Sequence, residues 1–185
     1  MSERDELLAL LREHSYREGT FTLASGATSS TYVDVRRTAL TARGAQLIGQ
    51  LACAAIIDAE WQTDAVGGMT LGADPLTTAI QLAGLSSGKS WSGVLVRKAP
   101  KAHGAESQIE RGGDLPDGGR VVALDDTVTT GGSSLKAIEA MRACGYIVQH
   151  ALCVVDRLEG GVETLAAAGV TLQALFTVED LRLRP

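Results

Sequence analysis

The sequence predicts an α/β fold built on a mostly parallel, twisted β-sheet flanked by helices. Short apolar runs with the length of buried strands alternate along the chain with segments of helical periodicity, the pattern of successive βα units. The clearest unit is the stretch 121–134, Val-Val-Ala-Leu-Asp-Asp-Thr-Val-Thr-Thr-Gly-Gly-Ser-Ser. In such sheets ligands bind at the carboxyl ends of the strands, so the polar end of this stretch predicts a binding site.

The first forty residues predict a helix followed by a hairpin. Ser2 and Asp5 have the spacing of a capping box, with Asp in place of Glu, and four leucines in the next six residues give the helix an apolar face. The expected elements are a helix ending before Gly19, a strand at 21–25, a turn at 26–30 and a strand at 31–35, after which comes the basic pair Arg36-Arg37.

The remaining elements alternate between helix and strand. Thr41 is a suitable cap for a long helix reaching about Asp58, and Pro75 falls in the first turn of a helix that continues to about Leu82. A third helix follows residue 134 and stops at Gly145. Strands are expected at 64–66, 94–96, 121–124, 147–155 and 170–176, and an Ala-rich helix at 162–168.

The turn that follows the 121–124 strand has the composition of an anion cradle. A strand, a turn of small residues and a helix N-terminus present free backbone N–H groups and the positive end of the helix dipole. Gly131 and Gly132 let the backbone approach a phosphate closely. The hydroxyls of Thr129, Thr130, Ser133 and Ser134 would add hydrogen-bond donors.

Asp125 and Asp126 need a separate partner, since they would repel a phosphate. Carboxylates accept hydrogen bonds from hydroxyls and ligate hard cations, so a sugar diol or a divalent metal ion would suit them. A phosphorylated sugar with Mg²⁺ satisfies both halves of the motif. The plainer interpretation is that Ser133 or Ser134 caps a helix while the two acids lie at a solvated strand end.

Residues 98–119 predict a long loop, with five glycines and no apolar periodicity. Arg97, Lys98, Lys101 and His103 place four potential cations within seven residues at its start. On a chain that is acidic overall, this cluster indicates either a solvated charge run or a lid over a strongly anionic ligand.

Composition limits the class of protein. The length of 185 residues suits one domain with a sizeable core, and the net charge of −5 argues against a general nucleic-acid surface. No apolar run has the length of a membrane span, and the charged N-terminus is unlike a signal peptide. Three cysteines without Cys-x-x-Cys spacing are typical of buried thiols in a reducing compartment such as the cytoplasm.

The motif at 121–134 resembles the phosphoribosyl-pyrophosphate (PRPP) signature of type I phosphoribosyltransferases, with Thr127 where an aliphatic residue is usual. Four further segments narrow the resemblance to the orotate phosphoribosyltransferase family. Residues 21–26 with 32–34 resemble its N-terminal strand and hood, and 67–75 its pyrophosphate loop. Residues 96–104 resemble its catalytic loop, and Asp156-Arg157 its orotate-binding pair.

The resemblance implies a single domain, with an N-terminal hood over about 1–40 and a flexible catalytic loop over about 98–119. It implies transfer of ribose 5-phosphate from PRPP to N1 of orotate, giving orotidine 5′-phosphate and pyrophosphate in pyrimidine (UMP) biosynthesis. Arg97, Lys101 and His103 would be catalytic, while Thr129 and Arg157 would bind orotate. The residues implied to bind PRPP are Arg97, Lys98, Lys101, His103, Asp125, Asp126, Thr127, Val128, Thr129, Thr130, Gly131, Gly132 and Ser133.

The resemblance also implies Mg²⁺ as cofactor, carried by the diphosphate without a dedicated protein cage, and a homodimer whose catalytic loop is shared between subunits. No nucleic acid or membrane partner is expected. Ala24 and Leu71 stand where many family members have lysines, and Arg36 or Arg37 are candidates to compensate.

Three alternatives stay open at this point. The first is a phosphoribosyltransferase for another base, which Arg157 disfavours because uracil and the purines lack a carboxylate. The second is a non-catalytic regulator that keeps the fold and binds nucleotide or RNA. The third is a receiver or phosphatase, which the absence of an Asp-x-Asp pattern disfavours.

Overall fold

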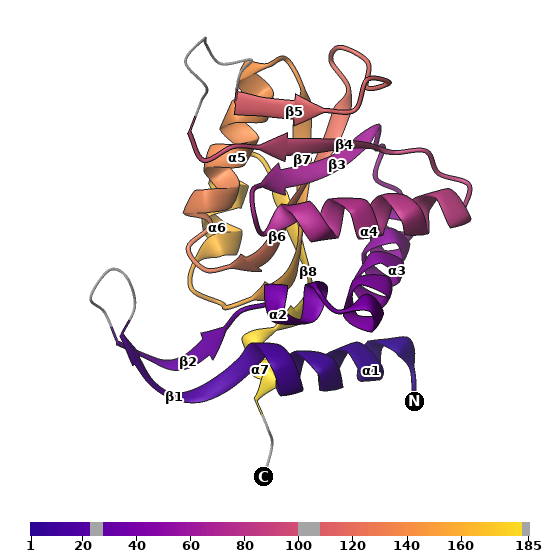
Figure 1. Cartoon of the computed structure of the whole chain (residues 1–185). Helices are drawn as coiled ribbons and strands as arrows, with labels where there is room; N and C mark the ends of the chain where they lie inside the picture. Colours follow the sequence, from indigo (N-terminus) through magenta and orange to yellow (C-terminus); the bar gives the residue numbers. More distant parts are fainter. Residues whose placement is uncertain (23–27, 100–107, 183–185) are drawn as a thin grey trace.

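The computed structural model describes residues 1–22, 28–99 and 108–182. In this part of the chain, six strands form the main sheet in the spatial order β5, β4, β3, β6, β7, β8 (Figure 1). All neighbouring pairs are parallel except β4 and β5, so the sheet is mostly parallel, as predicted. The strands are β3 (Ala65–Met69), β4 (Ser92–Val96), β5 (Ile109–Arg111), β6 (Arg120–Val128), β7 (Ile147–Asp156) and β8 (Thr171–Thr177).

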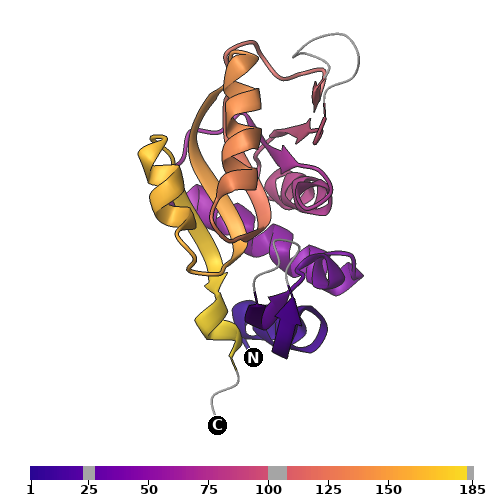
Figure 2. The same cartoon turned by 90° about the vertical axis from the view of Figure 1, so that its left-hand side faces the viewer.

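Helices cover both faces of this sheet (Figure 2). In β6, Val122 and Leu124 pack with helices α3 and α4, whereas Val121 and Ala123 pack with α5 on the opposite face. Each buried aliphatic side chain stabilises the fold by about 1.5–3 kcal/mol, so the two cores together fix the strand that ends in the acidic pair. These helices are α3 (Ala42–Asp58), α4 (Ala73–Ser86), α5 (Gly132–Ala143) and α6 (Gly161–Ala167).

The N-terminal segment forms a hood at one end of the sheet, beside the C-terminal helix (Figure 1). Leu7, Leu11 and Leu181 are fully buried in the same core as α3, which attaches the hood to the sheet domain. The hood consists of α1 (Glu3–Leu10), a π-helical turn (Leu11–Ser15), the antiparallel hairpin β1 (Tyr16–Thr22) and β2 (Thr28–Val33), and α2 (Arg36–Ala39); the C-terminal helix is α7 (Val178–Leu181).

Several local predictions are confirmed. Ser2 and Asp5 form the predicted capping box of α1. The Thr41 hydroxyl accepts a hydrogen bond from the Gly44 amide and caps α3. Gly145 follows the end of α5 with φ of 87°, where its lack of a Cβ removes the penalty of the left-handed conformation.

The predicted bounds of the two hairpin strands were wrong. The strands begin at Tyr16 and Thr28 instead of 21 and 31. Tyr16 is buried in the core as soon as the π-helical turn ends, so the first strand starts there. Asp34 and Val35 leave the second strand because Asp34 binds the side chain of Arg36, at the start of α2.

The prediction of a structureless loop over 98–119 was wrong in its second half. Ile109–Arg111 forms β5, an antiparallel edge strand paired with β4. This pairing satisfies backbone groups that β4 would otherwise leave exposed. A strand of three residues is too short to give a recognisable pattern in the sequence. Residues 100–107 lie outside the described part of the chain.

Candidate active site

A cavity of about 280 Å³ opens at the carboxyl ends of β3, β6 and β7, where parallel α/β sheets bind their ligands. The hood forms one side of it, through residues at the end of β2 and the start of α2. The lining residues are Val33, Asp34, Arg36, Met69, Thr70, Leu71, Gly72, Lys98, Asp125, Asp126, Thr127, Thr129, Ser133 and Arg157.

A second cavity of about 250 Å³ shares Asp125, Thr127, Thr129 and Ser133 with the first, so the two adjoin. It is the predicted anion cradle: its other lining residues are Val128, Thr130, Gly131, Gly132, Ser134 and Lys136. The backbone N–H groups of the first turn of α5 are available there. Lys136 of α5 adds a cation that the motif did not single out, although its position two residues after Ser134 could have indicated it.

Gly131 shapes this cradle. Its φ of 80° is left-handed, and a Cβ there would lie 3.2 Å from the carbonyl oxygen of Gly161. A side chain at this position would push the loop away from α6. The glycine therefore keeps the cradle closed against its neighbour and sets the start of α5.

Asp125 is held by a residue expected to serve the cradle. The Ser134 hydroxyl donates to Asp125 Oδ2 at 2.5 Å, and Ser134 is buried. This hydrogen bond fixes the carboxylate at the junction of the two cavities. Burial away from water, with Asp126 nearby, raises the pKa of Asp125 to about 7, although the bond from Ser134 favours the charged form.

Asp126 is held against the loop that follows β3. Its Oδ1 accepts from the backbone amide of Thr127 at 2.9 Å, and a Cβ on Gly72 would lie 2.6 Å from the same oxygen. Glycine at 72 therefore permits the acid and the loop to meet. This contact brings the predicted pyrophosphate loop and the acidic pair into one site.

Arg36 joins the hood to this site. Its Nε and Nη2 donate to the two carboxylate oxygens of Asp34 at 2.8 and 3.1 Å, and its Nε lies 4.0 Å from Asp126 Oδ2. The hydrogen bonds from Arg36 hold the pKa of Asp34 below its usual range. Of the two arginines in the basic pair, Arg36 lines the cavity and Arg37 does not.

Arg157 also lines the cavity and directly follows β7. Its side chain is only 8% exposed, and its Nη2 is 2.8 Å from Glu159 Oε1. Its backbone amide donates to the carbonyl of Val128 at 2.9 Å, which ties it to the end of β6. The sequence alone did not identify Glu159.

The four predicted cations between residues 97 and 103 do not share one position in the structure. Lys98 lines the cavity. Arg97 lies outside the lining and donates from Nε and Nη2 to Glu110 of β5, at 3.0 and 2.5 Å. Lys101 and His103, like Ala24, lie outside the described residues. Leu71 lines the cavity with 67% of its surface exposed.

The described residues contain no group of three or more His, Cys, Asp or Glu side chains arranged to hold a metal ion. None of their helices is both long and apolar enough to cross a membrane.

A mostly parallel sheet with an acidic pair and an anion cradle at the end of one strand defines the type I phosphoribosyltransferase class. No protein-family model matches the chain. The orotate phosphoribosyltransferase of Thermosynechococcus vestitus is 44% identical over 178 residues, covering 96% of this chain and 92% of the relative. The chain belongs to the orotate phosphoribosyltransferase family.

Two solved structures similar to this chain belong to the same family. The Mycobacterium tuberculosis H37Rv orotate phosphoribosyltransferase in complex with Fe(III) dicitrate has a TM-score of 0.85 and 40% identity, over 98% of this chain and 100% of that one. The same enzyme in complex with PRPP has a TM-score of 0.82 and 37% identity, with the same coverage. The single-domain α/β fold predicted from the sequence is therefore confirmed.

Proposed function

We propose that this chain transfers ribose 5-phosphate from PRPP to N1 of orotate, releasing pyrophosphate and giving orotidine 5′-phosphate in the de novo synthesis of UMP. One observation carries the proposal. A single cavity joins the acidic pair of β6 and the nearly buried Arg157 side chain, and it adjoins the anion cradle. A phosphorylated sugar and a carboxylate-bearing base would each find a partner of matching chemistry.

The sugar phosphate would bind along β6 and the start of α5. Asp125 and Asp126 would accept hydrogen bonds from the ribose hydroxyls, and residues 127–133 would hold the 5′-phosphate. Val128 is buried, so its contribution would come from its main chain. Lys136, in the same cavity, would add charge neutralisation.

Orotate would bind between Thr129 and Arg157. Its carboxylate matches the planar, bidentate donor fork of a guanidinium, which a nearly buried arginine presents in a fixed orientation. Uracil and the purines offer no such group. This pairing is the basis of the proposed preference for orotate.

The departing diphosphate would lie near the loop 69–72 and Lys98, which line the same cavity. We assign Arg97, Lys101 and His103 to a lid between β4 and β5 that would neutralise the charge developing on pyrophosphate. Glycosyl transfer passes through an oxocarbenium-like state that water can intercept, so closing the lid would also prevent hydrolysis. Arg36 would supply part of the charge that Leu71 lacks.

Mg²⁺ is the proposed cofactor, carried by the substrate diphosphate. The cavity wall fits such a role because Asp125 and Asp126 offer hard oxygen donors beside the phosphate cradle. When bound, the ion would neutralise charge on the diphosphate. The chain's own residues would orient the sugar and the base.

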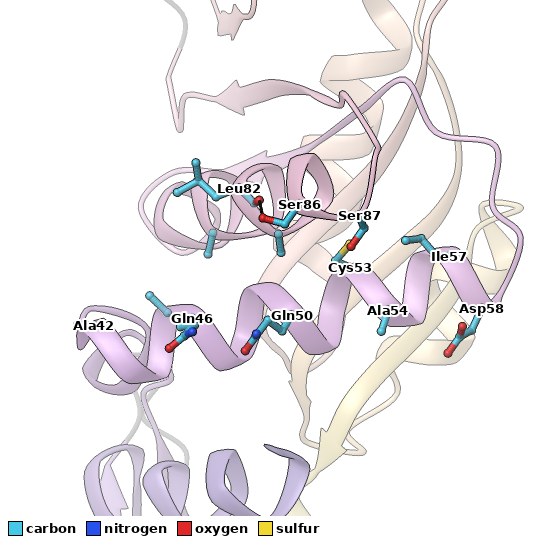
Figure 3. A pocket seen from close by; sticks show the side chains of 13 residues that line it. Ala42, Gln46, Gln50, Cys53, Ala54, Ile57, Asp58, Leu82, Ser86 and Ser87 are labelled. Carbon is cyan, nitrogen blue, oxygen red and sulfur yellow. Dashed lines mark hydrogen bonds between the residues drawn. The ribbon is translucent and has the colours of Figure 1, made fainter. Parts of the chain in front are cut away.

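We further propose a homodimer in the cytoplasm, with the lid of one subunit serving its partner's site. A groove of about 660 Å³ between α3 and α4 supports the dimer (Figure 3). Leu82 stands on its α4 side, with Gln46 and Gln50 on its α3 side. Leu82 and Leu85, one helical turn apart on α4, are 64% and 66% exposed and form an apolar pair that a partner subunit would cover. The buried Cys53 and Cys153 thiols fit a reducing compartment.

A turnover assay tests the proposed reaction. The protein is incubated with PRPP and Mg²⁺ plus orotate, uracil, adenine or guanine in turn, and loss of the base is followed. Loss of orotate alone is expected. Turnover of uracil or a purine without orotate would refute the proposal, and turnover of no base would favour a regulatory protein.

A further inference from the structure

The chain turns sharply after β7, and this turn determines what Arg157 faces. Asp156 is 4% exposed, and its Oδ1 accepts from the Leu158 amide at 2.8 Å. Leu158 has φ of 58°, in the left-handed region that costs a residue with a Cβ about 1–2 kcal/mol. A non-glycine residue persists there only when its surroundings impose the conformation, and such strain gathers at functional sites.

The strained turn places the side chains of Arg157 and Glu159 together. Their Nη2 and Oε1 atoms are 2.8 Å apart, although only one residue separates them in the chain. The Arg157 side chain is 8% exposed and the Glu159 side chain 41%. A nearly buried cation needs a counter-charge, since an unpaired one is costly to keep out of water. Glu159 supplies that charge from the solvent side.

We propose that Glu159 is a positioning residue that orients Arg157 and also weakens its attraction for the carboxylate of the substrate. The inference rests on the proposed function, in which Arg157 binds the orotate carboxylate. When orotate enters, two carboxylates share one guanidinium, and their mutual repulsion opposes binding. The product keeps the same carboxylate, so the same repulsion favours its release.

Two effects of Glu159 are therefore separable by substitution. Glu159→Gln keeps a carbonyl oxygen for the hydrogen bond but removes the charge. Glu159→Ala removes both the charge and the hydrogen-bond acceptor. Arg157 then loses the carboxylate that competes with the substrate and the contact that orients its side chain. The exposed Glu163 on α6 provides a matched control, because Glu163→Gln removes the same charge from the next turn of the chain.

The experiment measures KM and kcat for orotate, KM for PRPP, and the inhibition constant of uracil, which has no carboxylate. Glu159→Gln is expected to lower the KM for orotate about threefold at low salt, the range of a partly exposed ion pair, with the gain shrinking at high salt. The KM for PRPP and the inhibition constant of uracil should stay within about 1.5-fold of the wild type in Glu159→Gln. All measured constants of Glu163→Gln should stay within the same range. The KM of Glu159→Ala for orotate should be about fivefold above that of Glu159→Gln, because the Arg157 side chain is no longer held in one orientation before orotate binds.

An unchanged or higher orotate KM in Glu159→Gln would overturn the inference, as would an equal drop in Glu163→Gln. Equal orotate KM values for the Gln and Ala variants would show that Glu159 does not position Arg157. These outcomes are distinct from failure of the proposed function, which would appear as absence of orotate turnover in the wild type itself.

Discussion

Asp125 is subject to two opposing influences. Burial beside Asp126 disfavours its charged form, while the Ser134 hydroxyl favours it, and the net effect raises its pKa to about 7. An ordinary aspartate in an unfolded chain has a pKa of about 3.9. The folded state therefore binds this proton more tightly than the unfolded state does. The resulting stability is complete below about pH 4 and is lost as the pH rises through about 7.

Replacing Asp125 with Asn removes this dependence. Between pH 5 and pH 8 the wild type should lose stability relative to Asp125→Asn, with the difference widening by on the order of 1–2 kcal/mol. Urea unfolding of both proteins at the two pH values measures it. A difference that is the same at pH 5 and pH 8 would show that Asp125 is ionised throughout.

Arg157 would have a different role from Asp125 and Asp126, since it would contact only the base and not the sugar phosphate. Arg157→Gln should raise the KM for orotate about ten- to hundredfold, the effect of losing a charge-assisted bidentate contact. The KM for PRPP should change little. Arg157→Lys keeps the charge without the fork and should recover only part of the loss. Steady-state kinetics with each substrate varied in turn measures both, and equal losses for the two substrates would contradict the assignment.

At the scale of elements, the cradle depends on how α5 begins. Gly131→Ala should cost about 1–2 kcal/mol of unfolding free energy, because a Cβ at φ of 80° is strained. It should also weaken PRPP binding at least tenfold, because the loop must move away from Gly161.

Gly145→Ala is the matched control for this substitution. Gly145 has a similar φ of 87° at the other end of α5, and a Cβ there meets nothing within 4 Å. It should lose comparable stability while PRPP affinity, measured by calorimetry, stays at the wild-type value. If both variants bind PRPP equally well, the cradle is not the phosphate site.

The elements also show what sequence can and cannot predict. The unit from β6 to α5 was predictable because its strand, turn and helix signals are contiguous between Val121 and Gly145. The β5 edge strand and the bounds of the hairpin strands were not predictable, because distant pairing and the burial of Tyr16 decide them.

The residues of the candidate site also fall into those that the sequence predicts and those that it does not. Asp125, Asp126 and Arg157 could be named from local motifs. The approach of Arg36 to Asp126 depends on how the hood packs, and the pairing of Glu159 with Arg157 depends on the left-handed Leu158. Neither leaves a pattern in the neighbouring residues.

At the scale of the whole molecule, the exposed leucines of α4 predict self-association. The wild type should elute with twice the chain mass of 19.3 kDa in light scattering. Replacing Leu82 and Leu85 with Asp should give the single-chain mass, because charges would lie in the apolar contact. Val162→Asp, at an exposed position on the opposite face of the sheet, should leave the mass unchanged. A monomeric wild type would contradict the dimer.

A crystal structure of the chain with PRPP and Mg²⁺ would test the binding mode at atomic level. The ribose hydroxyls should lie within hydrogen-bond distance of Asp125 and Asp126, with the 5′-phosphate on the backbone amides of residues 129–133. A phosphosugar bound away from both carboxylates, or a cradle left without phosphate, would contradict the proposed function.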